Sequence, residues 1–98
     1  MAGRTPIPVW RAMRQVAAHL DLARRQQRIT MELLAERANL SVPTVRKLLS
    51  EGAGTFENFL RVARILGMLD GIVGATDPLR TPIGRARAEQ DVPKRVRG

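Results

Sequence analysis

The stretch "LLAERANLSVPTVRKLLSEG", residues 33–52, holds two apolar patterns of helical spacing with a short interruption between them. The first pattern ends at Asn39, and the second begins three residues later. Their apolar members are Leu33, Leu34 and Ala38 in the first pattern and Val45, Leu48 and Leu49 in the second. Because residues three and four apart lie on the same face of a helix, the spacing predicts two short helices, residues 31–38 and 42–50, joined by a tight turn.

The residues at the helix ends favour the same interpretation. Thr30 and Ser41 each precede a predicted helix, where a hydroxyl oxygen can accept a bond from an unpaired backbone N–H. Asn39 tolerates the positive φ that a tight turn often requires, and Pro43 lies in a first turn, where its missing N–H costs nothing. Ala35 is expected where the two helices cross, because a larger side chain would push them apart.

Two short helices joined in this way form a helix-turn-helix unit, which places its second helix in the major groove of DNA. The predicted outward face of residues 42–50 is basic and has no acidic residue. Arg46 or Lys47 could donate to guanine O6 and N7, whereas Val42 and Pro43 offer only apolar contact, for instance to a thymine methyl group. The candidates for contact with base edges are Val42, Pro43, Thr44, Arg46 and Lys47. The candidates for contact with phosphates are Arg24, Arg28, Ser50 and Thr55.

The charge of the whole chain points to a polyanionic partner. The 98 residues include 17 Lys and Arg against 9 Asp and Glu, a net charge of +8. Most of the cations are arginines, whose planar guanidinium suits phosphate and guanine edges. Two alternatives stay open, because a basic chain can be basic for solubility alone and a charged helix face is often only a solvated face.

Other classes of function are disfavoured by composition. The chain has no cysteine and a single histidine, so disulfides, thiolate metal sites and a histidine cluster are excluded. We therefore expect no enzymatic activity, no metal and no cofactor. No apolar run is long enough to span a bilayer, and the start of the chain lacks the pattern of a signal peptide, so a cytoplasmic location without membrane contact is expected.

The periodicity along the chain predicts an all-α fold. Beyond the two short helices, we expect a first helix over residues 9–27, a helix that starts at Thr55 and stops at Gly67, and a short helix within residues 68–74. Residues 1–8 are predicted to form an N-terminal arm, residues 9–74 the helical domain and residues 75–98 a basic tail. The aromatic residues are expected in the core: Trp10, Phe56 and Phe59.

The tail combines prolines and glycines with few large apolar residues, so it is expected to be flexible. Only "IGRARAEQ", residues 83–90, is suited to a turn or two of helix. The tail is expected to serve an external partner, either DNA phosphates or a protein, more than the fold. A candidate dimer seam precedes it at residues 68–73.

The segment "TMELLAERANLSVPTVRKLLSEG", followed by "TFENFLRVARILGMLD", resembles the lambda-repressor/Cro-like (XRE family) helix-turn-helix regulators over about residues 9–74. The resemblance implies a compact five-helix fold and a homodimer that binds an inverted-repeat operator in double-stranded DNA. The chain departs from the family pattern at Met31, where a phosphate-binding Gln is usual, and at Asn39, where Gly is usual. At Leu49 the family often has a Glu that pairs with an arginine of the first helix, so Arg24 is expected to lack a partner. The matched positions are Thr30, Leu34, Ala35, Leu40 and Ser41.

Three segments are similar to HipB-like antitoxins: "SVPTVRKLLSEG", "ENFLRVARILGMLDGI" and the ending "PIGRARAEQDVPKRVR". This similarity implies an antitoxin that represses its own toxin–antitoxin operon, with a HipA-like kinase toxin as partner. The alternative interpretation is a protein-interaction module of the same fold, which holds a partner and binds DNA weakly or without specificity.

Overall fold

The computed structural model describes residues 3–90 and 93–94, and all regular secondary structure in this part of the chain is helical. It contains six α-helices and one 3-10 helix and no strand, which confirms the all-α prediction. The helices are α1 (Ile7–Gln26), α2 (Met31–Ala38), α3 (Val42–Glu51), α4 (Phe56–Ile65), α5 (Leu69–Ala75), the 3-10 helix η1 (Pro78–Arg80) and α6 (Pro82–Ala88). Five of the α-helices, α1 to α5, lie within residues 7–75, and the sixth lies in the predicted tail.

Four of the α-helices begin at hydroxyl caps, and in α6 the cap is Thr81, which accepts the Gly84 backbone N–H. The side-chain oxygen of Thr30 accepts the Leu33 backbone N–H at 3.1 Å, and Ser41 accepts that of Thr44 at 3.3 Å. Thr55 caps α4 in the same way. Each hydroxyl pairs one of the backbone donors that a helix leaves free at its start. The predicted starts of α2, α3 and α4 are therefore confirmed.

The turn between α2 and α3 needs a left-handed residue, and Asn39 takes this role with a φ of 57°. Leu40 is half-buried against the core, directly after this turn. After α3 the chain reverses at Gly52, which has a φ of 70°. A Cβ atom at Gly52 would collide with the backbone carbonyl of Met13, so glycine lets α3 end close against α1.

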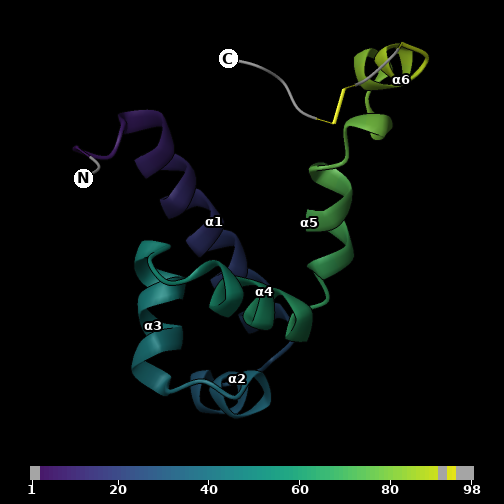
Figure 1. Ribbon diagram of the computed structural model, residues 1–98. Helices are drawn as coiled ribbons and strands as arrows, with labels where there is room; N and C mark the ends of the chain where they lie inside the picture. Colours follow the sequence, from purple (N-terminus) through teal and green to yellow (C-terminus); the bar gives the residue numbers. More distant parts are fainter. Residues whose placement is uncertain (1–2, 91–92, 95–98) are drawn as a thin grey trace.

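The core forms where α1, α2, α3 and α4 meet (Figure 1). Each of these helices contributes one apolar stripe, as helical periodicity requires. Leu34, Val45 and Val62 are fully buried at the centre. The remaining buried members of this cluster are Leu20, Ile29, Ala35, Ala38, Leu48, Leu49 and Leu66.

The first helix is longer at its start than predicted, because it begins at Ile7 and includes Pro8 in its first turn. Only the second half of α1 has buried residues, Ala17 and Leu20. In the first half, Trp10 is 49% exposed, so its expected place in the core is wrong. The guanidinium of Arg14 lies over the Trp10 ring at 5.1 Å and covers one side of it.

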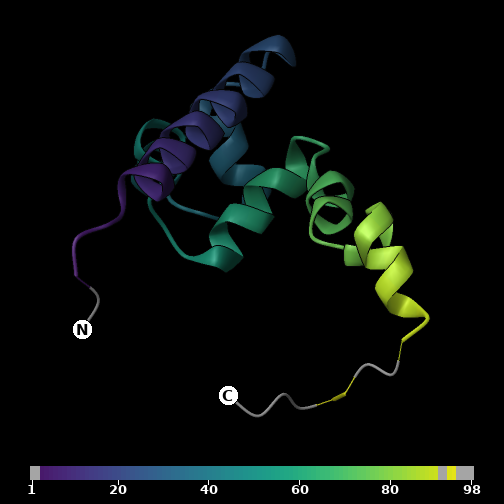
Figure 2. The same ribbon diagram turned by 90° about the horizontal axis from the view of Figure 1, so that it is seen from above.

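The last helices project from the core. Figure 2 shows α5 leaving the end of α4 and α6 lying farther out, beyond α5. The two-turn α6 matches the short helix that residues 83–90 suggested, although it starts at Pro82. Of the predicted arm and tail, residues 1–2, 91–92 and 95–98 lie outside the described residues. No described helix combines the length and the apolar character that a membrane crossing requires.

Candidate nucleic-acid interface

The outer side of α3 is a narrow stripe of exposed residues. Pro43, Arg46, Lys47 and Ser50 are exposed, whereas Val45, Leu48 and Leu49 on the other side are buried. The exposed positions follow the spacing i, i+3, i+4, i+7, so all four side chains leave the helix in one direction. The stripe presents two cations, and the only carboxylate of α3 is Glu51 in its last position. This stripe agrees with the outward face predicted from the sequence.

The remaining two base-contact candidates, Val42 and Thr44, are half-buried at the start of α3. The Thr44 hydroxyl lies 2.7 Å from the Ser41 hydroxyl, so its orientation is fixed by the helix cap. Val42 packs against the core cluster. Both residues border the exposed stripe and do not form its centre.

Ser50 and Thr55 differ in what their hydroxyls can offer to a phosphate. The Ser50 hydroxyl donates to the Arg46 backbone carbonyl at 2.8 Å, so its only proton is already in use. The Thr55 hydroxyl accepts a bond from the Asn58 N–H and is exposed, which leaves its proton free to donate. Of the two candidates, Thr55 is the better suited to an anion without rearrangement.

The expectation that Arg24 lacks a partner is wrong. Two of its nitrogens donate to the Asp21 carboxylate at 2.9 and 3.1 Å, and a third donates to the Ile29 backbone carbonyl at 2.9 Å. The Arg24 side chain is only 17% exposed. Asp21, one turn earlier on α1, supplies the carboxylate partner that was expected from a Glu at the position of Leu49. Arg24 therefore ties the end of α1 to the following turn, and we do not retain it as a phosphate contact.

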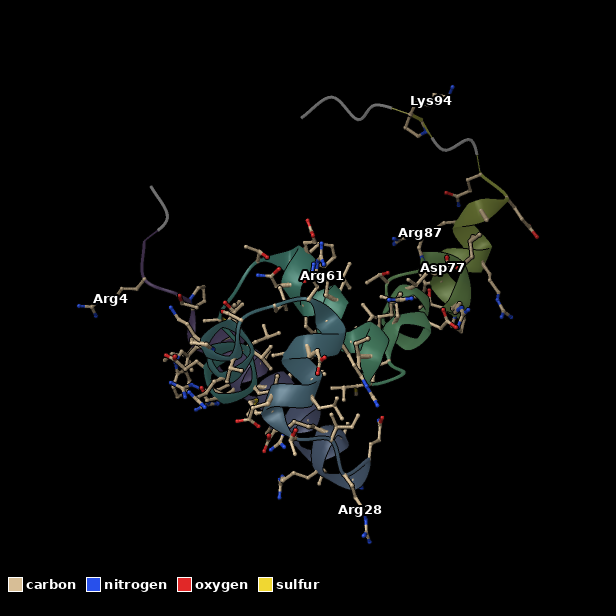
Figure 3. The ribbon with its side chains drawn as sticks, turned by 90° about the horizontal axis from the view of Figure 1, so that it is seen from below. Arg4, Arg28, Arg61, Asp77, Arg87 and Lys94 are labelled. Carbon is tan, nitrogen blue, oxygen red and sulfur yellow. The ribbon has the colours of Figure 1, made fainter. Side chains whose placement is uncertain are left out.

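Arg28 lies in the turn between α1 and α2 with a φ of 57°. Its side chain is exposed and points away from the rest of the molecule (Figure 3). Two residues later, Thr30 begins α2, and the N-terminal end of a helix favours anions. The structure thus leaves Arg28 available at the beginning of α2, at the opposite end of that helix from the turn into α3.

The sequence alone did not connect α1 with the basic stripe of α3. In the structure, α1 packs along α3, and Arg14 of α1 donates to the Ser50 backbone carbonyl at 3.3 Å. Arg11, one turn earlier, is also exposed. The positive surface therefore continues from α3 onto the first half of α1. The periodicity of α1 predicts that both arginines face solvent. It does not predict that Arg14 lies beside Ser50, which follows from the packing of α1 against α3.

The described residues contain no group of three or more His, Cys, Asp and Glu side chains that could hold a metal ion. They also contain no buried polar or charged residue. A comparison of the chain with protein-family models, with curated proteins and with solved structures gave no match. The assignment of a function therefore depends on the residues and their geometry.

Proposed function

We propose that the protein is a sequence-specific DNA-binding repressor in which α2 and α3 act as a helix-turn-helix unit and α3 enters the major groove. The observation that carries the proposal is the exposed stripe of α3, with Arg46 and Lys47 at its centre. The opposite side of α3 is fixed by buried Val45, Leu48 and Leu49, so the two cations stand on a rigid element. We interpret the first five helices as a lambda-repressor-like domain.

Recognition of base edges is assigned to the stripe. A single α-helix fits the major groove of B-DNA, and arginine or lysine donates there to guanine O6 and N7. Arg46 and Lys47 supply those donors, while Pro43 and the edge of Val42 supply apolar surface. Thr44 lies closer to the helix cap and contributes at the border of the contact.

Positioning on the DNA backbone is assigned to groups outside the stripe. Thr55 at the start of α4 has a free hydroxyl proton, and Arg28 is exposed before α2. Arg11 and Arg14 extend the positive surface on α1. Contacts of this type set register and supply salt-dependent affinity, but they do not read sequence.

A reading helix of this length covers only a few base pairs, so a useful operator needs two copies of the protein. We propose a homodimer on an inverted repeat whose half-sites are spaced by about one helical turn. We also propose that the protein is the antitoxin and autorepressor of a HipBA-like operon, with a HipA-like kinase toxin as partner. This part of the proposal rests on the resemblance of residues 41–52, 57–72 and 82–97.

The test is selection of binding sites from a random duplex pool, followed by titration of the selected site with single variants. Arg46→Ala and Lys47→Ala are each expected to weaken specific binding by about 1 to 3 kcal/mol and to relax the preference at one position. Arg64→Ala is the matched control, because Arg64 is an exposed arginine in the last turn of α4 and is not on the stripe. Equal affinity of all three variants, with unchanged thermal stability, contradicts the assignment of α3.

The alternative is a protein-interaction module of the same fold. It is favoured by one observation, an open apolar hollow of about 580 Å³ between α1 and the start of α4. A protein of this kind yields no enriched sequence in the selection and binds random DNA with the same salt dependence as any genomic fragment. The DNA-binding proposal requires the opposite result.

A further inference from the structure

A groove without charged side chains runs between α1, α4 and α5. It consists of two adjoining hollows, of about 580 and 410 Å³, which share Val16, Leu20 and Phe59. Among the described residues, no Lys, Arg, Asp or Glu lines either hollow. Figures 1 and 2 show that α1 and α5 diverge from α4 on the same side of the molecule.

The groove leaves large apolar side chains without cover. Phe56, expected in the core, is 73% exposed at the start of α4 and lines the first hollow. Val9 and Val16 of α1 line the same hollow and are also exposed. A continuous exposed apolar surface of this kind usually marks a site of association.

The same chain carries a second apolar surface without cover. The C-terminal arm, defined here as η1 and α6 (residues 78–88), exposes Leu79 and Ile83 by 53% and 65%. None of the arm's residues is buried. The arm is nevertheless ordered by its own bonds, since Asp77 accepts the Leu79 N–H and Arg85 donates to the Leu79 carbonyl, both at 2.9 Å. Leu79 lies in η1 and Ile83 in α6, with the extended residue Thr81 between them, so the arm presents one exposed apolar side chain from each of its two short helices.

The arm is held away from the groove of its own chain. The Arg80 guanidinium lies against Gly74 at the end of α5, so closely that a Cβ atom there would collide with it. Only Thr76 and Asp77 separate α5 from η1, which leaves little length for the arm to fold back. Figure 2 shows α6 at the far side of α5 from α1.

We propose that the occupant of the groove is the C-terminal arm of a second copy of this chain, and that two copies exchange arms around a two-fold axis. Leu79 and Ile83 are the anchors, and the receiving surface is formed by Val9, Val16, Phe56 and Phe59. Reciprocal exchange closes the assembly at two copies and covers both exposed surfaces of each chain. Since no Lys or Arg lines the two hollows, the basic arm meets no permanently cationic side chain there.

This assembly goes beyond DNA binding and forms without DNA, so it is tested on the free protein. Sedimentation of the full chain across a concentration series is expected to give the mass of two chains. Ile83→Glu and Val9→Glu are each expected to weaken the dimer at least tenfold, while far-ultraviolet circular dichroism keeps its helical signal. Leu22→Glu is the control, because Leu22 is an exposed apolar residue of α1 that lines neither hollow.

A disulfide test identifies the partners in the contact, since the chain has no cysteine of its own. Mixed Ile83→Cys and Val16→Cys proteins are expected to form a covalent heterodimer on oxidation, and mixed Ile83→Cys and Leu22→Cys proteins are not. The inference is overturned by a monomer at all concentrations, by a dimer that Ile83→Glu leaves intact, or by failure of the Ile83–Val16 pair to cross-link. A double-cysteine chain that closes on itself as a monomer also overturns it, because the occupant is then its own arm.

Discussion

At the scale of single residues, two glycines with positive φ allow the energetic cost of backbone strain to be measured apart from the cost of a steric collision. Gly52 and Gly67 have φ values of 70° and 78°. Gly67 has open space around it, whereas a Cβ atom at Gly52 meets the Met13 carbonyl. Gly67→Ala is expected to lower the free energy of unfolding by about 1 to 2 kcal/mol, the cost of a left-handed alanine.

Gly52→Ala carries the same strain and an added collision with Met13, for which overpacking costs about 1 to 3 kcal/mol more. Urea denaturation of the two variants measures the difference. Equal destabilisation by the two substitutions would mean that α1 and α3 can move apart, at no cost in free energy, to make room for the added methyl group. A larger effect at Gly67 would contradict the proposed role of the Gly52 contact.

At this scale, the sequence could predict interactions between residues that are close together along the chain. Asn39 and the caps were predicted because each requires only its own neighbours along the chain. The Asp21 partner of Arg24 was not predicted, because the resemblance pairs this arginine with position 49, although Asp21 stands three residues before Arg24 and is equally local. The Arg14–Ser50 contact was beyond prediction, because it joins residues 36 positions apart.

At the scale of helices, the N-terminal cap of α3 stabilises the helix that carries the exposed stripe. Ser41 accepts the Thr44 N–H and also lies within hydrogen-bond distance of the Thr44 hydroxyl. Ser41→Ala is expected to lower the free energy of unfolding by about 1 kcal/mol, because one helix-start donor loses its partner. Ser50→Ala, whose hydroxyl bonds only a carbonyl within α3, is expected to cost less. Urea denaturation tests both, and an equal cost would show that the cap has no special weight.

Helix boundaries followed from sequence where the chain marks both ends, as it does for α2 between Thr30 and Asn39. The sequence was less successful in predicting which side chains of α1 and α4 are buried. Periodicity identifies the apolar side of a helix, but it does not say whether the same chain provides the surface that covers it. Phe56 lines an open hollow between α1 and α4 and is exposed for that reason, and Trp10 on the first half of α1 is exposed as well.

At the scale of the whole molecule, the charge of +8 is spread over several surfaces, and salt dependence can show which of them faces DNA. In our proposal the first half of α1 lies beside the exposed stripe of α3. Arg14 donates a hydrogen bond to the end of α3, and Arg11 lies one turn away. Arg37 and Arg64 are equally exposed on α2 and α4 and are assigned no contact. Arg11 and Arg14 beside the stripe can therefore be compared with Arg37 and Arg64 away from it.

Each phosphate contact releases condensed counterions, so the slope of log affinity against log salt changes by about 0.9 for each contact in one copy. For a dimer, Arg11→Ala is therefore expected to reduce the slope by about 1.8, and Arg37→Ala and Arg64→Ala by much less. Arg14→Ala is a weaker probe, because it also removes the contact with Trp10 and the bond to Ser50. Titrations of one selected duplex at four or more salt concentrations give the slopes. If all the variants have the same slope as the unaltered chain, the first half of α1 does not touch the DNA backbone, and the interface is limited to α3 and the helix starts around it.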